Sequence, residues 1–374
     1  MKIDSVPAAS DKYVKELDGM RAVAIMIVVC AHYRIVPVPG GFGVTLFFFL
    51  SGYLITTLFY AEYHSDGGIN IFKFYLRRWL RLTPPLIISV ILAVSLYHVS
   101  RVNVGGTQVP LGTTMAALLY YTNYYDLAWM MEPSRVIPFG VCWSLAVEEH
   151  FYLLWPLIVK TNIQKTTTRL LAIIIILCAT VMVWRFIAHY VIKVQTDYTG
   201  MATDCRIDSI LYGALLRVLF ESPWAAVAVN ICKARVTRIA ALLVLLVCFA
   251  VPYEGFRETV RYSLQGIALM PVFTAILVDR PDTVARRILS SPPMVLVGRL
   301  SYSIYLFHLM ARTPAEVIFG SPYRIESTIS GLILTGALSY VVFIFVELPI
   351  ARIRHALRGK ERIVASRPAI QSEV

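Results

Sequence analysis

The chain has 374 residues, of which 57% are apolar or aromatic and 16% are charged. Soluble domains average about 45–50% apolar and about 25% charged residues, so this composition argues against a soluble protein and indicates an integral membrane protein. Lys and Arg outnumber Asp and Glu by 35 to 23. Cytoplasmic loops of membrane proteins collect basic residues, so the surplus requires no nucleic acid, and we expect none as a partner.

Apolar segments of spanning length recur along the whole chain. A spanning helix needs about 20 mostly apolar residues, and ten segments fit, which predicts an all-α polytopic membrane protein. The ten segments are 19–36, 42–60, 83–100, 140–159, 170–191, 207–220, 238–252, 262–278, 296–316 and 327–347.

An eleventh apolar stretch, 112–131, carries Tyr, Asn and Asp toward its end. Polar groups survive at membrane depth only against protein or water, so we expect this stretch to be interfacial or re-entrant. Counting it as a span would move two basic clusters to the outer side. Ten spans instead keep the basic loops and both termini in the cytoplasm, as the positive-inside rule requires.

The spans form one expected domain, 1–350, followed by a basic cytoplasmic tail, 351–374. No segment between the spans is long enough for an independent core. The six cysteines lack paired spacing, so we expect no structural metal and no disulfide framework. Residues 1–17 are mixed polar, and we expect no cleavable signal.

Ionisable residues inside a membrane are costly and by default mark a functional site. The first span carries Arg21 and His32, eleven residues apart. Eleven steps of 100° bring them within about 20° of each other on one helix face, about 16 Å apart along the axis. The alternative is that Arg21 is a snorkelling anchor and His32 a helix-end residue. In the second span, the glycines and Ser51 of GGFGVTLFFFLSGYLI permit close helix packing.

The loop INIFKFYLRRWLRLTPPL interleaves basic and aromatic residues, a pattern that suits a helix at the cytoplasmic interface. Arg78 and Arg81 are three residues apart and can grip phosphate groups by bidentate hydrogen bonds. Lipid anchoring is the alternative. We expect Lys73, Arg77 and Trp79 to belong to the same donor-binding surface.

The segment CWSLAVEEHFYLLWPL puts three adjacent ionisable residues, Glu148, Glu149 and His150, near membrane depth. Adjacent helical residues cannot all point in one direction, so at least one is expected to enter a polar cavity. Glu148, Tyr152 and Trp155 form one stripe. A structural Glu that bonds a neighbouring helix remains the alternative.

Two later segments, GRLSYSIYLFH and VELPI, carry further polar residues that either belong to the site or bond neighbouring helices. They are Arg299, Ser301, Tyr302, Tyr305, His308 and Glu347. For substrate contact we single out Ser144, Tyr152 and Tyr302.

Together these motifs resemble the membrane acyltransferase family 3, over about residues 16–350. Five segments occur in family order: ELDGMRAVAIMIVVCAHY, GGFGVTLFFFLSGYLI, RRWLRLTPP, WSLAVEEHFYLLWP and GRLSYSIYLFH. The resemblance implies a bacterial inner-membrane O-acyltransferase that moves an acyl group, usually acetyl, from cytoplasmic acyl-coenzyme A (acyl-CoA) to a hydroxyl. By this resemblance, the family's essential His and its companion Arg correspond to His32 and Arg21. The family's loop arginines correspond to Arg78 and Arg81, and its acidic residue corresponds to Glu148. We expect no extracytoplasmic esterase-like domain after the helices, such as some members carry.

The chemistry of the residues fits this assignment. An alcohol is a poor nucleophile near neutral pH, and His is the side chain best suited to take its proton. We expect His32 to deprotonate the acceptor, Glu148 or Glu149 to orient a partner group, and Arg21 to stabilise charge. A transient acyl-His32 would serve equally. No metal is expected to take part.

Several alternatives stay open. The acyl group could be acetyl, succinyl or longer. The acceptor could be an exopolysaccharide, a lipopolysaccharide O-antigen, a lipid-linked oligosaccharide, a nodulation-type signal or a macrolide-like small molecule. A proton-coupled transporter would use His32 and Glu148 but gives the basic loop no task. A transferase with a lipid-linked sugar donor would also use a basic inner loop and would not depend on coenzyme A.

Overall fold

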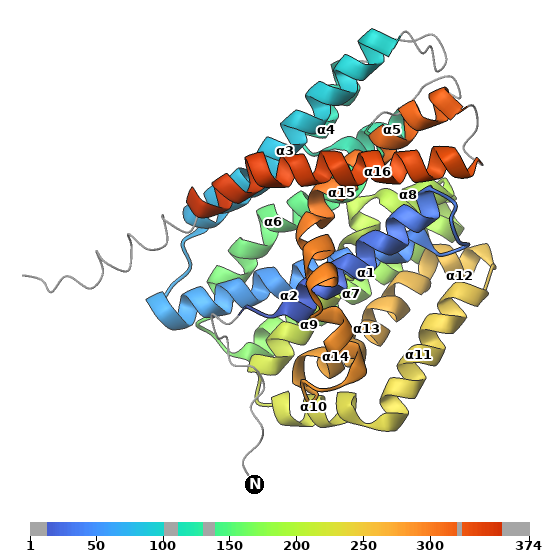
Figure 1. The fold of residues 1–374 in the computed structure, drawn as a ribbon. Helices are drawn as coiled ribbons and strands as arrows, with labels where there is room; N and C mark the ends of the chain where they lie inside the picture. Colours follow the sequence, from blue (N-terminus) through green and yellow to red (C-terminus); the bar gives the residue numbers. More distant parts are fainter. Residues whose placement is uncertain (1–12, 101–110, 130–138, 320–323, 354–374) are drawn as a thin grey trace, which may run out of the picture.

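The computed structural model of the protein describes residues 13–100, 111–129, 139–319 and 324–353. Nearly all of the predicted basic tail, from residue 354 onward, lies outside these ranges. All regular secondary structure in the described part is helical (Figure 1). The helices are α1 Lys15–His32, α2 Gly40–Asp66, α3 Ile71–Ser100, α4 Leu111–Leu118, α5 Thr122–Trp129, α6 Trp143–Asn162, α7 Thr167–Phe186, α8 Thr196–Met201, α9 Thr203–Glu221, α10 Ala225–Lys233, α11 Arg235–Ala250, α12 Glu254–Thr259, α13 Arg261–Val278, α14 Val284–Leu289, α15 Pro292–Phe319 and α16 Ile325–Val342.

Six helical segments in the described ranges are long and apolar enough to cross a membrane, which supports an integral membrane protein. They are Gly40–Asp66, Ile71–Leu96, Thr167–Ile192, Arg261–Val278, Pro292–Glu316 and Ile325–Ile353. A seventh would be Thr196–Glu221 together with Ala225–Lys233, bent by 119°. The predicted segments 19–36, 140–159 and 238–252 fall largely on α1, α6 and α11, which do not meet this test. The count of ten spans and the cytoplasmic termini therefore stay predictions.

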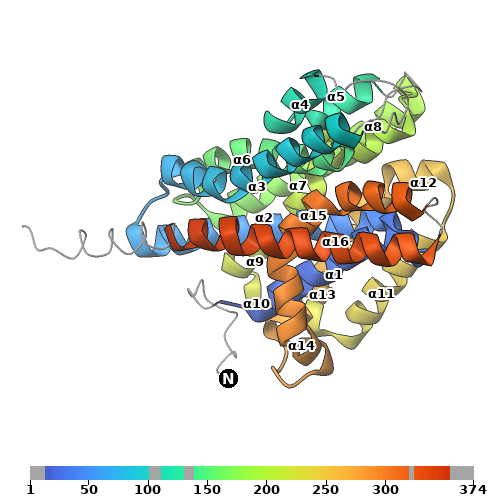
Figure 2. The same cartoon turned by 45° about the horizontal axis from the view of Figure 1, so that its top comes forward.

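Two expected details can be compared with the helices directly. The stretch 112–131 contains α4 and α5, which have 8 residues each and are too short to span a membrane; its last two residues lie outside the described ranges. The helices α4 and α5 pack beside α3, α6 and α8 (Figure 2).

The basic loop is not a separate interfacial helix. It is the first part of α3, which continues through Pro84 and Pro85, as membrane helices can because neighbouring groups satisfy the freed backbone.

Glycines set the closest helix contacts. Gly52 of α2 lies against the backbone of Ile210 in α9, and Gly213 of α9 lies against the backbone of Phe49 in α2. A Cβ atom at either position would overlap a carbonyl oxygen. The small residues of the second span therefore serve packing, one of the roles that small residues take at membrane helix interfaces.

A buried ion pair fastens α7 and α9 in the same region. Arg185 donates two hydrogen bonds to the carboxylate of Asp208, at 2.9 and 2.7 Å, and both side chains are fully buried. Ser263 of α13 donates to the same carboxylate at 2.9 Å. The cost of burying both charges is offset by this bidentate geometry.

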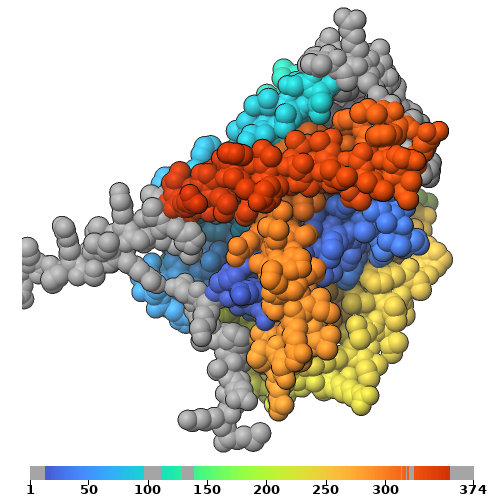
Figure 3. Space-filling model, viewed as in Figure 1, coloured from blue at the N-terminus to red at the C-terminus, as the bar shows by residue number. Residues whose placement is uncertain are grey.

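The helices α15 and α16 cover α1 on one side of the molecule (Figure 1). α15 packs against α1, and α16 crosses α15 (Figures 1 and 3). Gly298 of α15 lies directly on the backbone of Asp18 in α1, so the two helices approach closely. This contact brings the polar residues of the late segment GRLSYSIYLFH next to those of the first span.

Candidate active site

A cavity of about 480 Å³ lies among α1, α2, α3, α6 and α15, with one lining residue each from α9 and α13. Its volume is within the range of about 300–1,000 Å³ that is typical of small-molecule sites. It brings together residues from all five segments that were singled out in the sequence. The polar side chains among those lining it include Arg21, Ser51, Arg78, Arg81, Ser144, Glu148, Ser301, Tyr302 and Tyr305.

Arg78 and Glu148 form the polar centre of this cavity. A guanidinium nitrogen of Arg78 lies 3.7 Å from the Glu148 carboxylate, and the two side chains are 13% and 14% exposed. Ser51 and Tyr152 each donate a hydrogen bond of 2.9 Å to Glu148, one to each carboxylate oxygen. The guanidinium also lies 3.8 Å from the centre of the Tyr152 ring, a cation–π distance. Tyr152 therefore supports both charged groups.

Arg21 lines the cavity from α1. It forms an ion pair of 3.0 Å with Asp18, whose other carboxylate oxygen accepts a hydrogen bond from Tyr13. Arg299 of α15 donates to the Tyr13 hydroxyl at 3.0 Å. With Arg78, Arg81 and Arg217, which pairs with Glu221, Arg21 makes four arginines along one cavity, an arrangement suited to an anionic ligand.

Tyrosines occupy the α15 wall. Tyr302 donates a hydrogen bond of 2.7 Å to the carbonyl oxygen of Leu82 in α3. Tyr305 donates to the carbonyl oxygen of Val141 at 2.8 Å and accepts from Ser144 at 2.6 Å. These bonds tie α15 to α3 and to the start of α6.

The cavity reaches Phe47 and Tyr305, whose ring centres are 6.3 Å apart. The Tyr305 ring centre is 5.8 Å from that of His308, one turn further along α15. His32 is not among the residues that line the cavity. It stacks on His308, with ring centres 4.9 Å apart. The Tyr305 ring therefore lies between the cavity and the imidazole pair.

The imidazole pair is held by hydrogen bonds between helices. Nδ1 of His32 lies 2.8 Å from Nε2 of His308. Arg312 donates to the backbone carbonyl oxygen of His32 and pairs with Glu316, while Tyr33 donates to the backbone carbonyl oxygen of His308 at 2.8 Å. The pair joins the end of α1 to the middle of α15.

Three expected donor-binding residues point elsewhere. Arg77 pairs with Glu62 of α2 at 3.0 Å, and neither Arg77, Lys73 nor Trp79 is among the residues lining the cavity. Trp79 is 58% exposed. Adjacent helical residues are rotated by 100°, so Arg77 and Trp79 cannot share the face of Arg78.

The three adjacent ionisable residues of α6 separate as expected. Glu148 faces the cavity, whereas His150 lies 2.7 Å from the hydroxyl of Thr203 in α9. One carboxylate oxygen of Glu149 is buried without a hydrogen-bond partner among the described residues. Glu148 is therefore the member of the trio that lines the cavity.

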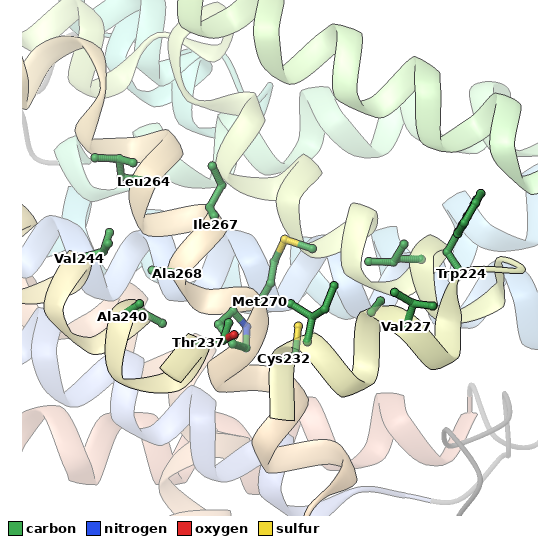
Figure 4. Close-up of a pocket in the computed structure, with 15 residues that line it drawn as sticks. Trp224, Val227, Cys232, Thr237, Ala240, Val244, Leu264, Ile267, Ala268 and Met270 are labelled. Atoms are coloured by element: carbon green, nitrogen blue, oxygen red, sulfur yellow. The ribbon is translucent and has the colours of Figure 1, made fainter. Parts of the chain in front are cut away.

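A second cavity, of about 580 Å³, lies between α10, α11 and α13 (Figure 4). Its described lining is apolar apart from residues such as Thr237 and Cys232, and none of these lining residues is charged. It offers neither a cation for an anionic donor nor a base. The described ranges also contain no group of three or more His, Cys, Asp or Glu side chains placed to hold a metal ion.

The contact of His308 with His32 is not predicted by the sequence, which indicates only that His308 either belongs to the site or bonds a neighbouring helix. Its position ten residues after Gly298, the glycine that packs on α1, was the available signal. The contact to His32 joins residues 276 positions apart and follows from the packing of α1 on α15.

Comparisons with known proteins agree with these motifs. A family model described as "Acyltransferase domain" matches residues 14–351. Among curated proteins, O-acetyltransferase OatA of Staphylococcus aureus is 26% identical over 360 residues, covering 92% of this chain and 58% of that protein. Peptidoglycan O-acetyltransferase OatA of Listeria monocytogenes is 28% identical over 361 residues, covering 92% and 56%.

The chain thus spans little more than half the length of these relatives. No solved structure matches it. The family match nevertheless covers all five motifs and every helix that contributes to the cavity. The chain belongs to the acyltransferase family that this model describes.

Proposed function

We propose that the protein is a membrane O-acetyltransferase that moves an acetyl group from acetyl-CoA to a hydroxyl of a cell-envelope carbohydrate. The observation that carries this proposal is the cavity, which combines four arginines with two carboxylates, Asp18 and Glu148, and extends to a tyrosine beside an imidazole pair. An anionic donor needs the arginines, and transfer to an alcohol needs the imidazole. The arginines lie in the cavity and the imidazole pair lies beyond Tyr305, so the two groups stand at opposite ends of the route proposed for the acetyl group.

The donor assignment rests on charge. Coenzyme A carries phosphate groups, and Arg is the side chain best suited to bidentate phosphate binding. Arg78 is held in place by Tyr152 and Glu148, so it is preorganised before a ligand arrives. If the basic end is cytoplasmic, as the loop charges predict, the donor enters from the inside.

The chemical step is assigned to His32. Its Nε2 accepts the proton of the acceptor hydroxyl while the oxygen attacks the thioester carbonyl; the carbon–sulfur bond then breaks, and the proton passes to the departing thiolate. In this proposal the side chain of Tyr305 moves aside to admit the thioester, since its ring lies between the cavity and the imidazole pair. Arg21 and Glu148 act on the donor side.

The acceptor is proposed from the relatives. The Listeria protein is named a peptidoglycan O-acetyltransferase, which favours a glycan hydroxyl of the cell wall over an exopolysaccharide or an O-antigen. We propose the cytoplasmic membrane as its location, because a cytoplasmic donor and an external acceptor can meet there. Acetyl is preferred to succinyl because both relatives are named O-acetyltransferases.

The test is acetyl transfer by the purified full chain in proteoliposomes, with radiolabelled acetyl-CoA and peptidoglycan glycan strands. We expect label on the glycan that mild base releases, as an O-acetyl ester requires. Folded protein that transfers no label from acetyl-CoA to glycan strands contradicts the proposal. Transfer that depends instead on a lipid-linked sugar would support a different donor class.

A further inference from the structure

The end of α1 and the middle of α15 share an imidazole pair whose protonation pattern is fixed by its surroundings. Nδ1 of His308 lies 2.8 Å from the carbonyl oxygen of Tyr305 and 3.2 Å from that of Ile304. A carbonyl oxygen only accepts hydrogen bonds, so Nδ1 of His308 carries a proton. In the neutral ring, Nε2 of His308 is then an acceptor.

That acceptor determines the state of the second ring. Nδ1 of His32 lies 2.8 Å from Nε2 of His308, so it must donate and must carry the proton of the neutral His32 ring. The other nitrogen of His32, Nε2, keeps its lone pair. This is the nitrogen that a base uses, and none of the hydrogen bonds described for His32 involves it.

We propose that His308 is a positioning residue that holds His32 in the tautomer whose Nε2 is open to the acceptor hydroxyl. The proposal rests on the proposed function, because it assigns a role to the base of that reaction. When His32 takes the proton, its Nδ1–H keeps an acceptor in His308, which stabilises the imidazolium. A metal-bound or catalytic histidine generally has its free tautomer set by the partner of its other nitrogen.

The surroundings make the pair rigid. His308 is fully buried, and its backbone carbonyl oxygen accepts from Tyr33, which also bonds Thr335 of α16. Arg312 holds the backbone carbonyl oxygen of His32.

The test compares two substitutions of His308 in the full chain. His308→Phe keeps an aromatic ring but removes the acceptor, whereas the side-chain oxygen of His308→Gln can still accept from His32. Positioned general-base catalysis contributes about 10²–10⁴-fold, so we expect kcat of His308→Phe to fall by about 10²-fold or more. The KM for acetyl-CoA should stay within about twofold, since the donor arginines are elsewhere. His308→Gln should recover about tenfold or more of the lost kcat.

A purely structural role gives a different pattern. Both variants would then lose melting temperature, and kcat and KM would change together without rescue by Gln. If His308→Phe unfolds, the comparison of His308→Gln with His308→Leu decides, because only the former offers an acceptor. If folded His308→Gln, which offers a hydrogen-bond acceptor, has the same kcat as folded His308→Phe or His308→Leu, which do not, the inference is overturned.

A second measurement does not depend on acetyl transfer. Diethyl pyrocarbonate modifies unprotonated imidazole nitrogen, and mass spectrometry locates the adduct. We expect His32 to react in the wild type and several-fold more slowly in His308→Phe, with partial recovery in His308→Gln. Unchanged modification of His32 in folded His308→Phe contradicts the positioning role. Wild-type protein that fails to transfer acetyl groups, yet shows this pattern of modification, refutes the proposed function and leaves the tautomer assignment supported.

Discussion

Replacing Arg78 by alanine tests whether the cavity binds an anionic donor. The Arg78 side chain is 13% exposed, lines the cavity and lies over the Tyr152 ring, 3.8 Å from its centre. A hydrogen bond to a charged group contributes about 1.5–3 kcal/mol, and each 1.4 kcal/mol changes Kd tenfold, so Arg78→Ala should weaken acetyl-CoA binding by about 10- to 150-fold. Arg78→Lys keeps the charge without the planar fork and should give an intermediate loss.

The substitution should not unfold the protein. Glu148 keeps its hydrogen bonds from Ser51 and Tyr152, and its ion pair with Arg78 is 3.7 Å long and faces a cavity. A partly solvated pair of this kind contributes about 1 kcal/mol or less. A small change in melting temperature with a large change in Kd is therefore the expected combination.

The matched control is the neighbouring residue. Arg77 pairs with Glu62 and lies away from the cavity, so Arg77→Ala should leave the acetyl-CoA Kd within about twofold. The assay is isothermal titration or ligand-induced thermal stabilisation of the detergent-solubilised full chain. Native-like affinity in folded Arg78→Ala, or an equal loss in Arg77→Ala, would refute the assignment of Arg78.

Three further predictions concern stability, each measured by thermal unfolding in detergent. Gly52→Leu should prevent the packing of α2 on Ile210 of α9, because even a Cβ overlaps the backbone there, and overpacking costs about 1–3 kcal/mol or more; folding at wild-type yield would contradict this. Asp208→Asn should cost about 3–5 kcal/mol by leaving the Arg185 charge unpaired, and an unchanged melting temperature would show that the pair contributes little. Burial raises the pKa of Asp126 in α5 to about 7, so this group disfavours folding increasingly as pH rises from about 4 to about 7, by up to about 4 kcal/mol; Asp126→Asn should remove that part of the pH dependence, and an identical pH profile would contradict it.

The sequence predicted the helical class and most of the spans because burial in lipid imposes long apolar runs. It also located Glu148, because charge at membrane depth is costly and seldom without a role, and Arg78, because two arginines three residues apart suit phosphate binding. Both residues line one cavity. These inferences need only local composition, residue spacing and the known cost of moving charge into hydrocarbon.

Other features depend on helix rotation and long-range packing. Arg77 and Arg78 are equivalent in composition, yet only Arg78 faces the cavity. The contact of His32 with His308 and the ion pair of Arg185 with Asp208 join helices whose arrangement one sequence does not specify. The helices α1 and α6 carry charged residues among their apolar ones, and α11 has only 16 residues, so none of the three has the length and apolar character of the six candidate spans.

The central claim is that the imidazole of His32 takes the proton of the acceptor hydroxyl. The most direct measurement is acetyl transfer from acetyl-CoA to glycan strands by His32→Ala in proteoliposomes, with acetyl-CoA binding measured on the same preparation. The account predicts that kcat falls by about 10²–10⁴-fold while the acetyl-CoA Kd stays within about twofold, because His32 lies outside the donor cavity. Transfer at the wild-type rate by folded His32→Ala would contradict it.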